Sequence, residues 1–162
     1  MKRMLLIVLA LLLACAVSLA EVGMPNPWTQ TTAKELMDAL GLQLGLPDGA
    51  MNVNWQMLKA EQLGEVQFTW KGVDYRARVA PTDDFEDISG VYFDWQVRES
   101  CAVGRCEGAC LYGEGEDGAR GLCLWFDERT GLMYSLSAAA DDLKASNILS
   151  AANILYIPMQ TE

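Results

Sequence analysis

Four cysteines in the second half of the sequence are the residues whose type and spacing best suit specific chemistry. They are Cys101, Cys106, Cys110 and Cys123, in the pattern C-x4-C-x3-C-x12-C. Thiols grouped in this way form structural disulfides, bind a soft metal ion as thiolates, or exchange with other thiols in redox reactions. Which chemistry applies depends on the compartment and on whether the fold brings the sulfur atoms together.

The sequence favours two structural disulfides over the other two alternatives. An exported chain enters an oxidising compartment, and each bridge stabilises a fold by about 2–4 kcal/mol. We predict the pairs Cys110–Cys123 and Cys101–Cys106, although four cysteines also allow other pairings. A four-cysteine zinc site comes second, because the C-x2-C spacing of zinc knuckles is missing. A redox-active pair comes third, because the chain has no C-x-x-C motif.

Alternating polar and apolar residues predict the strands that position these cysteines. In Glu65–Lys71 the alternation is unbroken, so Val66, Phe68 and Trp70 share one face of a sheet. Similar runs occur at Tyr75–Ala80, Val91–Val97, Cys106–Tyr112, Gly121–Phe126 and Leu132–Ser137, and an imperfect one at Met51–Leu58.

Two predicted turns determine how the cysteines face one another. A two-residue turn at Gly104-Arg105 places Cys101 opposite Gly108. A symmetric hairpin further on places Cys110 directly opposite Cys123, with Cβ atoms about 4.5–5.5 Å apart. All four cysteines then lie on one face of three adjacent strands, where their sulfur atoms can meet.

Helices are predicted on both sides of these strands. Thr32 and Glu35 form a capping box before a short helix that ends at Gly41. A second helix is predicted from Ala140 to Leu155. We therefore predict an α+β fold, with an N-terminal helix, an antiparallel β-meander of about six to seven strands, and a C-terminal helix packed on the sheet.

The first twenty residues are typical of a secretory signal peptide. Two cations precede an unbroken apolar run, Met4–Ala14, and Ser18-Leu19-Ala20 offers a small-x-small cleavage site. We predict a single exported domain, residues 21–162, that is secreted or held in the cell envelope. No second apolar run of this kind follows, so no membrane-spanning segment is predicted.

An alternative cleavage site lies within the same leader. The stretch Leu12-Leu13-Ala14-Cys15 resembles a bacterial lipobox, in which Cys15 would be lipidated and become the new N-terminus. Leucine at the middle position and the apolar residues after Cys15 argue against it. Simple secretion is therefore the favoured interpretation, and a lipid anchor at Cys15 is the alternative.

The charge of the mature chain restricts its partners. Without residues 1–20 the chain keeps 10 cations and 22 carboxylates, a formal charge of −12. Such a chain repels phosphate backbones and anionic lipid, so neither nucleic acid nor a membrane surface is expected as a partner. The acidic stretch Asp83–Asp87 lacks the alternating ligands of a calcium loop, and we interpret it as a solvated loop.

The chain contains no histidine, which removes the commonest general base and the triads built on it. No phosphate-binding or dinucleotide-binding motif is present. We assign no catalytic, cofactor or metal-ligating residue, although a hydrolase with a carboxylate pair remains an alternative. The tryptophans of the predicted strands, Trp70, Trp95 and Trp125, are expected in the core and not in a sugar-binding surface.

Three short motifs stand out along the chain: Asn26-Pro27 before the capped helix, Asp87-Ile88-Ser89-Gly90, and Tyr134-Ser135-Leu136-Ser137. In this order they resemble a family of small secreted or lipid-anchored proteins of Gram-positive bacteria that carry a domain of unknown function. The likeness spans Met24 to Leu155. It implies no assigned activity and no catalytic residue, and it leaves the four cysteines as a local addition.

From these observations we expect an exported, non-catalytic domain that binds a protein or a component of the cell envelope. The alternative, from another class, is a metal- or redox-active domain that uses the four cysteines. An unrecognised hydrolase is the third expectation.

Overall fold

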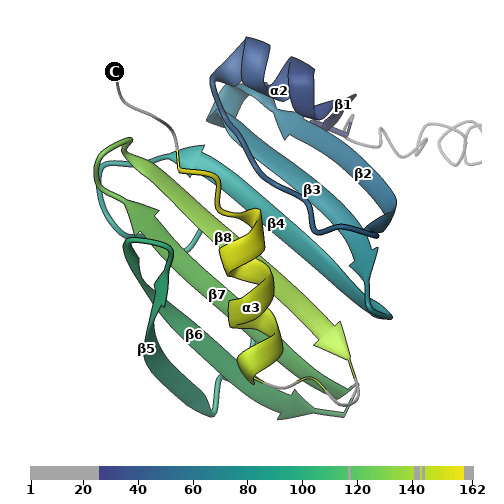
Figure 1. The fold of residues 1–162 in the computed structure, drawn as a ribbon, viewed down its shortest axis with the longest axis vertical. Helices are drawn as coiled ribbons and strands as arrows, with labels where there is room; N and C mark the ends of the chain where they lie inside the picture. The colour runs from purple at the N-terminus through teal and green to yellow at the C-terminus, as the bar shows by residue number, and fades with distance from the viewer. Residues whose placement is uncertain (1–25, 117, 141–142, 144, 159–162) are drawn as a thin grey trace, which may run out of the picture.

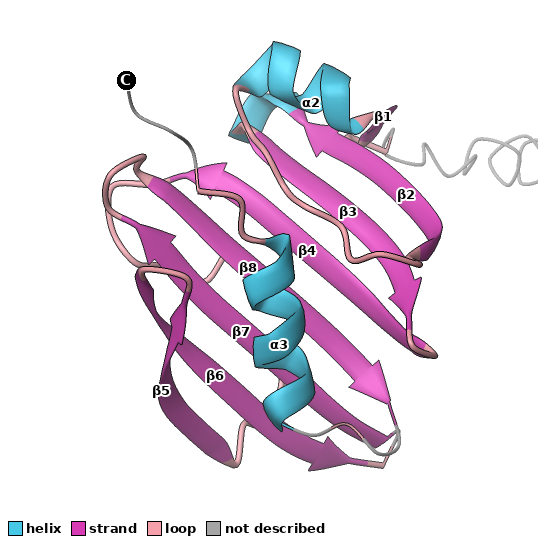
Figure 2. Cartoon of the chain, viewed as in Figure 1, coloured by secondary structure: helices cyan, strands magenta, loops and turns pink. Residues whose placement is uncertain are grey.

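The computed structural model describes residues 26–116, 118–140, 143 and 145–158. The predicted signal peptide and the alternative lipidation site, Cys15, lie outside these residues. The described part is dominated by one antiparallel sheet (Figure 1), and Figure 2 separates its helices and strands. The elements are β1 (Thr29–Thr31), α2 (Ala33–Leu40), β2 (Met51–Leu58), the 3-10 helix η1 (Lys59–Glu61), β3 (Leu63–Trp70), β4 (Val73–Pro81), β5 (Val97–Val103), β6 (Cys106–Gly115), β7 (Gly118–Asp127), β8 (Leu132–Ala140) and α3 (Ala145–Leu155).

The strand order is β1-β2-β3-β4-β8-β7-β6-β5. Two meanders therefore meet where β4 pairs with β8, and the chain after β4 crosses to the far edge of the sheet before β5 begins. Neighbouring strands are antiparallel throughout. The last meander, β5 to β8, contains all four cysteines of the described part of the chain.

The predicted fold class is wrong. An eight-stranded sheet replaces the α+β arrangement with a single meander of six to seven strands, and only two short α-helices accompany it. The first described element is strand β1, not a helix. The predicted strand Val91–Val97 is mostly loop, because β5 starts only at Val97. The C-terminal helix begins at Ala145, since β8 continues to Ala140.

The capped helix itself is confirmed as α2. The Thr32 hydroxyl accepts a hydrogen bond from the Glu35 backbone N–H, the Glu35 carboxylate accepts one from the Thr32 N–H, and Gly41 ends the helix at φ 68°. Only Leu36 is buried on α2, where its side chain packs over Gly64 of β3. Neither helix in the described residues is long and apolar enough to cross a bilayer.

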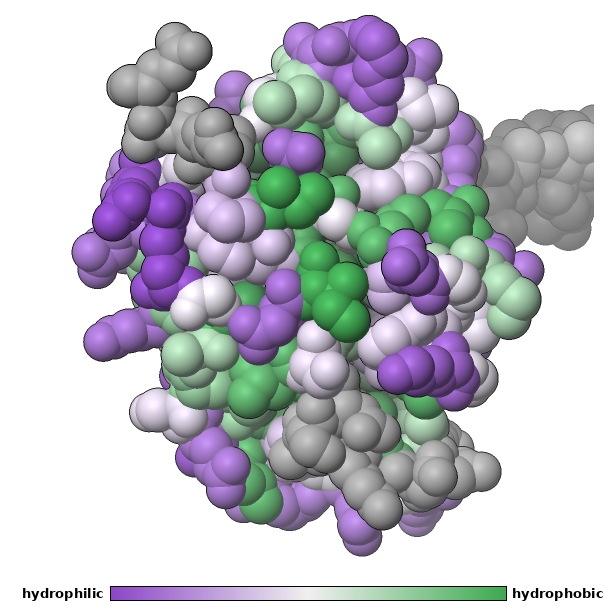
Figure 3. Space-filling model, viewed as in Figure 1, coloured by the Kyte–Doolittle hydropathy of each residue, from purple (hydrophilic) through white to green (hydrophobic). Residues whose placement is uncertain are grey.

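The main core lies on the face of the sheet that α3 covers, which we call the helix face. α3 crosses the second meander on this side (Figure 1). Apolar residues follow the middle of this face, and hydrophilic residues gather toward its edges (Figure 3). The core here combines strand and α3 side chains, among them Val66, Phe68, Tyr75, Val79, Trp125, Tyr134, Leu136, Ile148, Ala151, Ala152 and Leu155.

A smaller core lies on the opposite face, which we call the loop face. Leu122, Leu124 and Met133 are its most buried members, beside two residues of β6, and Ile88 and Trp95 pack against it from the segment between β4 and β5. Strand β7 is therefore apolar on both faces, as its sequence predicts for a central strand. The acidic stretch of the same connecting segment is exposed to solvent, as predicted.

Aromatic side chains fill the helix-face core. Trp125 and Tyr134 are buried and stack at 5.2 Å between ring centroids, and Tyr156 meets Tyr134 edge-on at 5.8 Å. The expected core position of Trp125 is confirmed, whereas Trp70 and Trp95 are only partly buried. Stacked rings of this kind add about 0.5–1.5 kcal/mol beyond the burial of their area.

The end of α3 is fixed to the sheet by a buried carboxylate. The Tyr156 hydroxyl donates a hydrogen bond of 2.7 Å to Asp127, and the Arg105 guanidinium donates one of 3.1 Å to the same oxygen. Burial favours the neutral form of the Asp127 carboxyl and so tends to raise its pKa. These two bonds, together with one from the Arg129 backbone N–H, favour the charged form more strongly. The pKa of Asp127 is therefore held below its ordinary value.

The lowered pKa of Asp127 predicts a loss of stability in acid. The carboxylate stabilises the fold fully above its unfolded pKa of about 4, and this contribution is lost as the pH falls through the lower folded value. We expect Asp127→Asn to lower the urea midpoint of unfolding at pH 7. Below about pH 4, the midpoint of this variant should fall less steeply with decreasing pH than that of the wild type. Asp84→Asn, in the exposed acidic loop, is the matched control, and equal acid sensitivity in both variants would contradict the assignment.

Candidate functional site

The β5–β6–β7 register places the cysteines as their spacing predicts. Cys101 pairs with Gly108 and Val103 with Cys106 around the turn at Gly104 and Arg105. Across the next hairpin Cys110 lies directly opposite Cys123. All four cysteines lie on the helix face, within or against its core.

Three of the four sulfur atoms converge. The Sγ atoms of Cys110 and Cys123 are 3.4 Å apart, and those of Cys101 and Cys123 are 3.8 Å apart. All three lie within 4.8 Å of one another. Cys123 is completely buried, Cys110 is 5% exposed, and Cys101 is partly exposed on the edge strand β5. We call Cys101, Cys110 and Cys123 the thiol cluster.

Cys106 lies apart from the thiol cluster. It forms a hydrogen bond with the Tyr156 hydroxyl, which belongs to the group around Asp127. The structure thus groups Cys101 with Cys123 and Cys110, not with Cys106 as the predicted second disulfide requires. The four described cysteines are free thiols in this structure, and their pairing as disulfides stays a prediction.

Gly108 makes the convergence sterically feasible. It lies opposite Cys101, and a Cβ atom at this position would lie 3.2 Å from Cys101 Sγ and 2.5 Å from the Leu124 backbone oxygen. Because glycine has no side chain, the Cys101 sulfur can lie over β6 and approach Cys123 on β7. The sequence contains this glycine, but its role depends on the register and side-chain direction.

We expect Gly108→Ala to disturb the cluster and the sheet together. The added methyl group must displace either Cys101 or the β7 backbone, an overpacking that costs about 1–3 kcal/mol. A lower urea midpoint and a changed rate of Cys101 alkylation would be measured on the purified chain. If both quantities equal those of the wild type, Gly108 does not position Cys101.

Hydrogen bonds and burial shift the pKa values of the three thiols in the cluster in different directions. The hydrogen bond between Cys110 and Cys123, opposed by burial, lowers the pKa of Cys110 to about 7. Burial raises the pKa of Cys101 to about 12. The bond to Cys110, followed by burial, raises the pKa of Cys123 far above its ordinary value. The contacts within the cluster therefore lower the pKa of Cys110 and raise the pKa values of its two neighbours.

One carboxylate shares this part of the helix face. Glu99 is the cross-strand neighbour of Cys110 on β5, and its charge acts on the Cys110 pKa. Opposed residues in antiparallel strands have Cβ atoms about 4.5–5.5 Å apart. Glu99 is exposed and Cys101, also on β5, is partly exposed, whereas Cys110 and Cys123 are buried.

A second polar group, centred on Glu65, is buried on the loop face. The sequence does not predict it. Glu65 is 1% exposed and accepts hydrogen bonds from Arg78 at 2.6 Å, Gln56 at 2.5 Å and Gln67 at 2.6 Å. These bonds outweigh the effect of burial and lower the Glu65 pKa. The alternation of this strand predicts a polar face, but polarity alone cannot show that a carboxylate on that face is enclosed.

Comparisons of the chain with protein-family models, with curated proteins and with solved structures find no match. The resemblance to Gram-positive proteins of unknown function therefore stays a prediction.

Proposed function

We propose that this chain is a non-catalytic domain that binds one thiophilic metal ion, zinc in the first instance, through Cys101, Cys110 and Cys123. The spacing of the three sulfur atoms carries this proposal. Zinc–sulfur bonds of about 2.3 Å in a tetrahedron place the sulfur ligands about 3.8 Å apart. The Sγ distances of 3.4 Å and 3.8 Å, with all three atoms within 4.8 Å, are close to that requirement.

The fourth position of such a site needs a ligand of another kind. The chain has no histidine, and Cys106 lies outside the thiol cluster. Water or the carboxylate of Glu99 would complete the tetrahedron, since Glu99 lies opposite Cys110 on the same face. A site with three protein ligands and one exchangeable position binds and releases its ion more readily than a closed four-cysteine site.

A disulfide between Cys110 and Cys123 is the competing proposal. Their direct opposition across β6 and β7 supports it, and so does the oxidising compartment predicted from the leader. A disulfide uses two sulfur atoms, however, and does not account for the third, which Gly108 allows to approach. A metal ion uses all three, which is why the geometry favours it.

Anaerobic titration of the reduced chain with zinc, followed by native mass spectrometry, distinguishes the two proposals. The metal proposal predicts one zinc ion per chain and protection of three thiols from alkylation. An air-exposed chain that has lost two hydrogens at Cys110 and Cys123, and a reduced chain that does not retain zinc, would contradict it.

The expected location outside the cytoplasm belongs to the same proposal. A soft metal ion held by three thiolates would keep these sulfurs reduced in an oxidising compartment, because the bound thiolates are not free to react. A protein or envelope partner stays a further prediction, and pull-down with zinc-loaded and zinc-free chain tests whether such a partner depends on the ion.

A further inference from the structure

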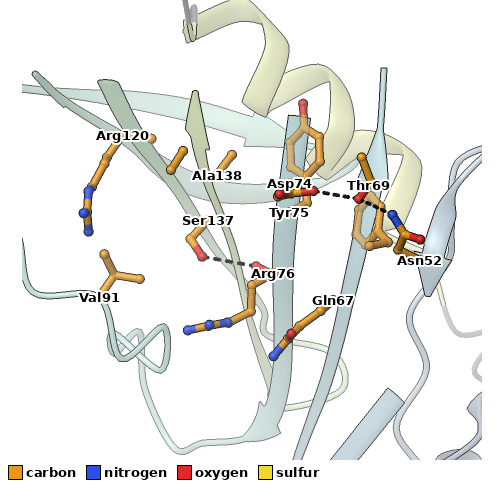
Figure 4. A pocket seen from close by; sticks show the side chains of 13 residues that line it. Asn52, Gln67, Thr69, Asp74, Tyr75, Arg76, Val91, Arg120, Ser137 and Ala138 are labelled. Atoms are coloured by element: carbon orange, nitrogen blue, oxygen red, sulfur yellow. Dashed lines mark hydrogen bonds between the residues drawn. The ribbon is translucent and has the colours of Figure 1, made fainter. Parts of the chain in front are cut away.

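A second candidate site lies on the loop face, away from the thiol cluster. A cavity of about 500 Å³ opens there over β3, β4, β8 and β7. Its polar side chains include Arg76, Arg120 and Ser137 at one side and Thr69 and Asp74 at the other (Figure 4).

Small residues of β8 create the hollow between the two arginines. β8 lies between β4 and β7, where Ser137 pairs with Arg76 and Ala139 pairs with Arg120. The two arginines therefore flank β8 from its two sides, with an offset of two residues along the strand. The β8 side chains between them are short. In Figure 4 both guanidinium groups are directed toward Val91, which closes the cavity on that side.

The positive charge of Arg76 is only partly neutralised. Its nearest carboxylate is Glu65, at 3.7 Å, which is beyond hydrogen-bond distance. Both Glu65 oxygens already accept short bonds from Arg78 and from two glutamines. The Arg76 side chain is 45% exposed, so its guanidinium N–H groups remain available to a ligand in the cavity.

Arg120 is held by an aromatic ring and not by a carboxylate. Its guanidinium lies over the Phe93 ring at 5.3 Å from the centroid. Within the described residues it forms no ion pair, as the ion pairs there involve Lys34, Arg76, Arg78 and Arg105. Stacking fixes the plane of the guanidinium and leaves its edge free for hydrogen bonds.

We propose that this cavity binds a small organic carboxylate between Arg76 and Arg120. Planar guanidinium groups match the two oxygens of a carboxylate, and charge-assisted bonds of this geometry are among the stronger ones in proteins. Ser137 lies between the arginines, where its hydroxyl donates a hydrogen bond of 3.4 Å to the Arg76 backbone oxygen and its small side chain leaves room for a ligand. Asp74, which accepts a bond of 2.6 Å from Thr69, adds negative charge at the other side and disfavours a large polyanion.

Titration of the ¹⁵N-labelled chain with sodium succinate, at constant ionic strength, tests the proposal. We expect saturable shifts of backbone amides in β4, β7 and β8. Arg76→Gln and Arg120→Gln should each weaken binding about tenfold or more, because each removes a charge-assisted contact. Arg98→Gln, which removes an exposed arginine of β5 outside the cavity, should leave the affinity unchanged.

A cavity-filling variant distinguishes binding of succinate in the cavity from nonspecific attraction of the anion to positive charge. Ala139→Leu adds volume beside Arg120 without a change in charge, and it should abolish the succinate shifts while the amide spectrum stays that of a folded chain. Absence of saturable shifts in the wild type would overturn the proposal. So would equal weakening by Arg98→Gln, or tighter binding of inorganic phosphate than of succinate.

Discussion

Replacing Cys123 with serine is expected to abolish stoichiometric zinc binding. Cys123 is the sulfur that contacts both other members of the thiol cluster, at 3.4 Å and 3.8 Å. Loss of a residue that only supports a metal ligand costs about 10–100-fold in affinity, so loss of a direct thiolate ligand should cost at least about a hundredfold. Competition with a chromophoric chelator measures the change.

Two further variants make this result specific. Cys106→Ser removes another buried thiol of the helix face that lies outside the cluster, so it should retain one zinc ion per chain. Cys101→Ser alters the most exposed ligand and should weaken binding without a large change in folding. Equal zinc affinity for Cys106→Ser and Cys123→Ser would contradict the assignment of ligands.

The largest loss of folding stability is expected for Glu65→Ala. The substitution leaves the Arg78 guanidinium, 16% exposed, without its carboxylate, and two glutamine amides lose their acceptor. Breaking a buried ion pair from one side typically costs about 3–5 kcal/mol, because the remaining charge is neither paired nor hydrated. Urea unfolding at pH 7 measures the change in the free energy of unfolding.

Glu61→Ala is the matched control for this change. Glu61 is an exposed carboxylate only four positions earlier, and its removal should alter stability by less than about 0.5 kcal/mol. Glu65→Gln keeps the shape of the side chain and should fall between the two. A Glu65→Ala chain as stable as the Glu61→Ala chain would show that the group around Glu65 adds nothing to the fold.

Local sequence patterns predict the strands and the positions of the cysteines well. Alternation identifies β3, β4, β6, β7 and β8, and the two-residue turns give the observed pairs Cys101–Gly108 and Cys110–Cys123. These features depend on neighbours in the chain. A period of two and a turn of known length suffice to place residues opposite one another.

The errors arise where distant segments decide the outcome. Val91–Val97 alternates like a strand, yet most of it forms part of the connection that covers the loop face, because β8 occupies the position beside β4. The enclosure of Glu65 likewise depends on Gln56 and Arg78 from adjacent strands. The third sulfur of the thiol cluster depends on free space above Gly108, which no periodicity shows.

The most direct measurement is X-ray absorption at the zinc edge of the zinc-loaded chain. If Cys101, Cys110 and Cys123 hold the ion, the spectrum contains three sulfur scatterers at about 2.3 Å and one lighter atom near 2.0 Å. A first shell with two sulfurs or fewer, or one made only of oxygen, would contradict the assignment of these three cysteines as the metal site.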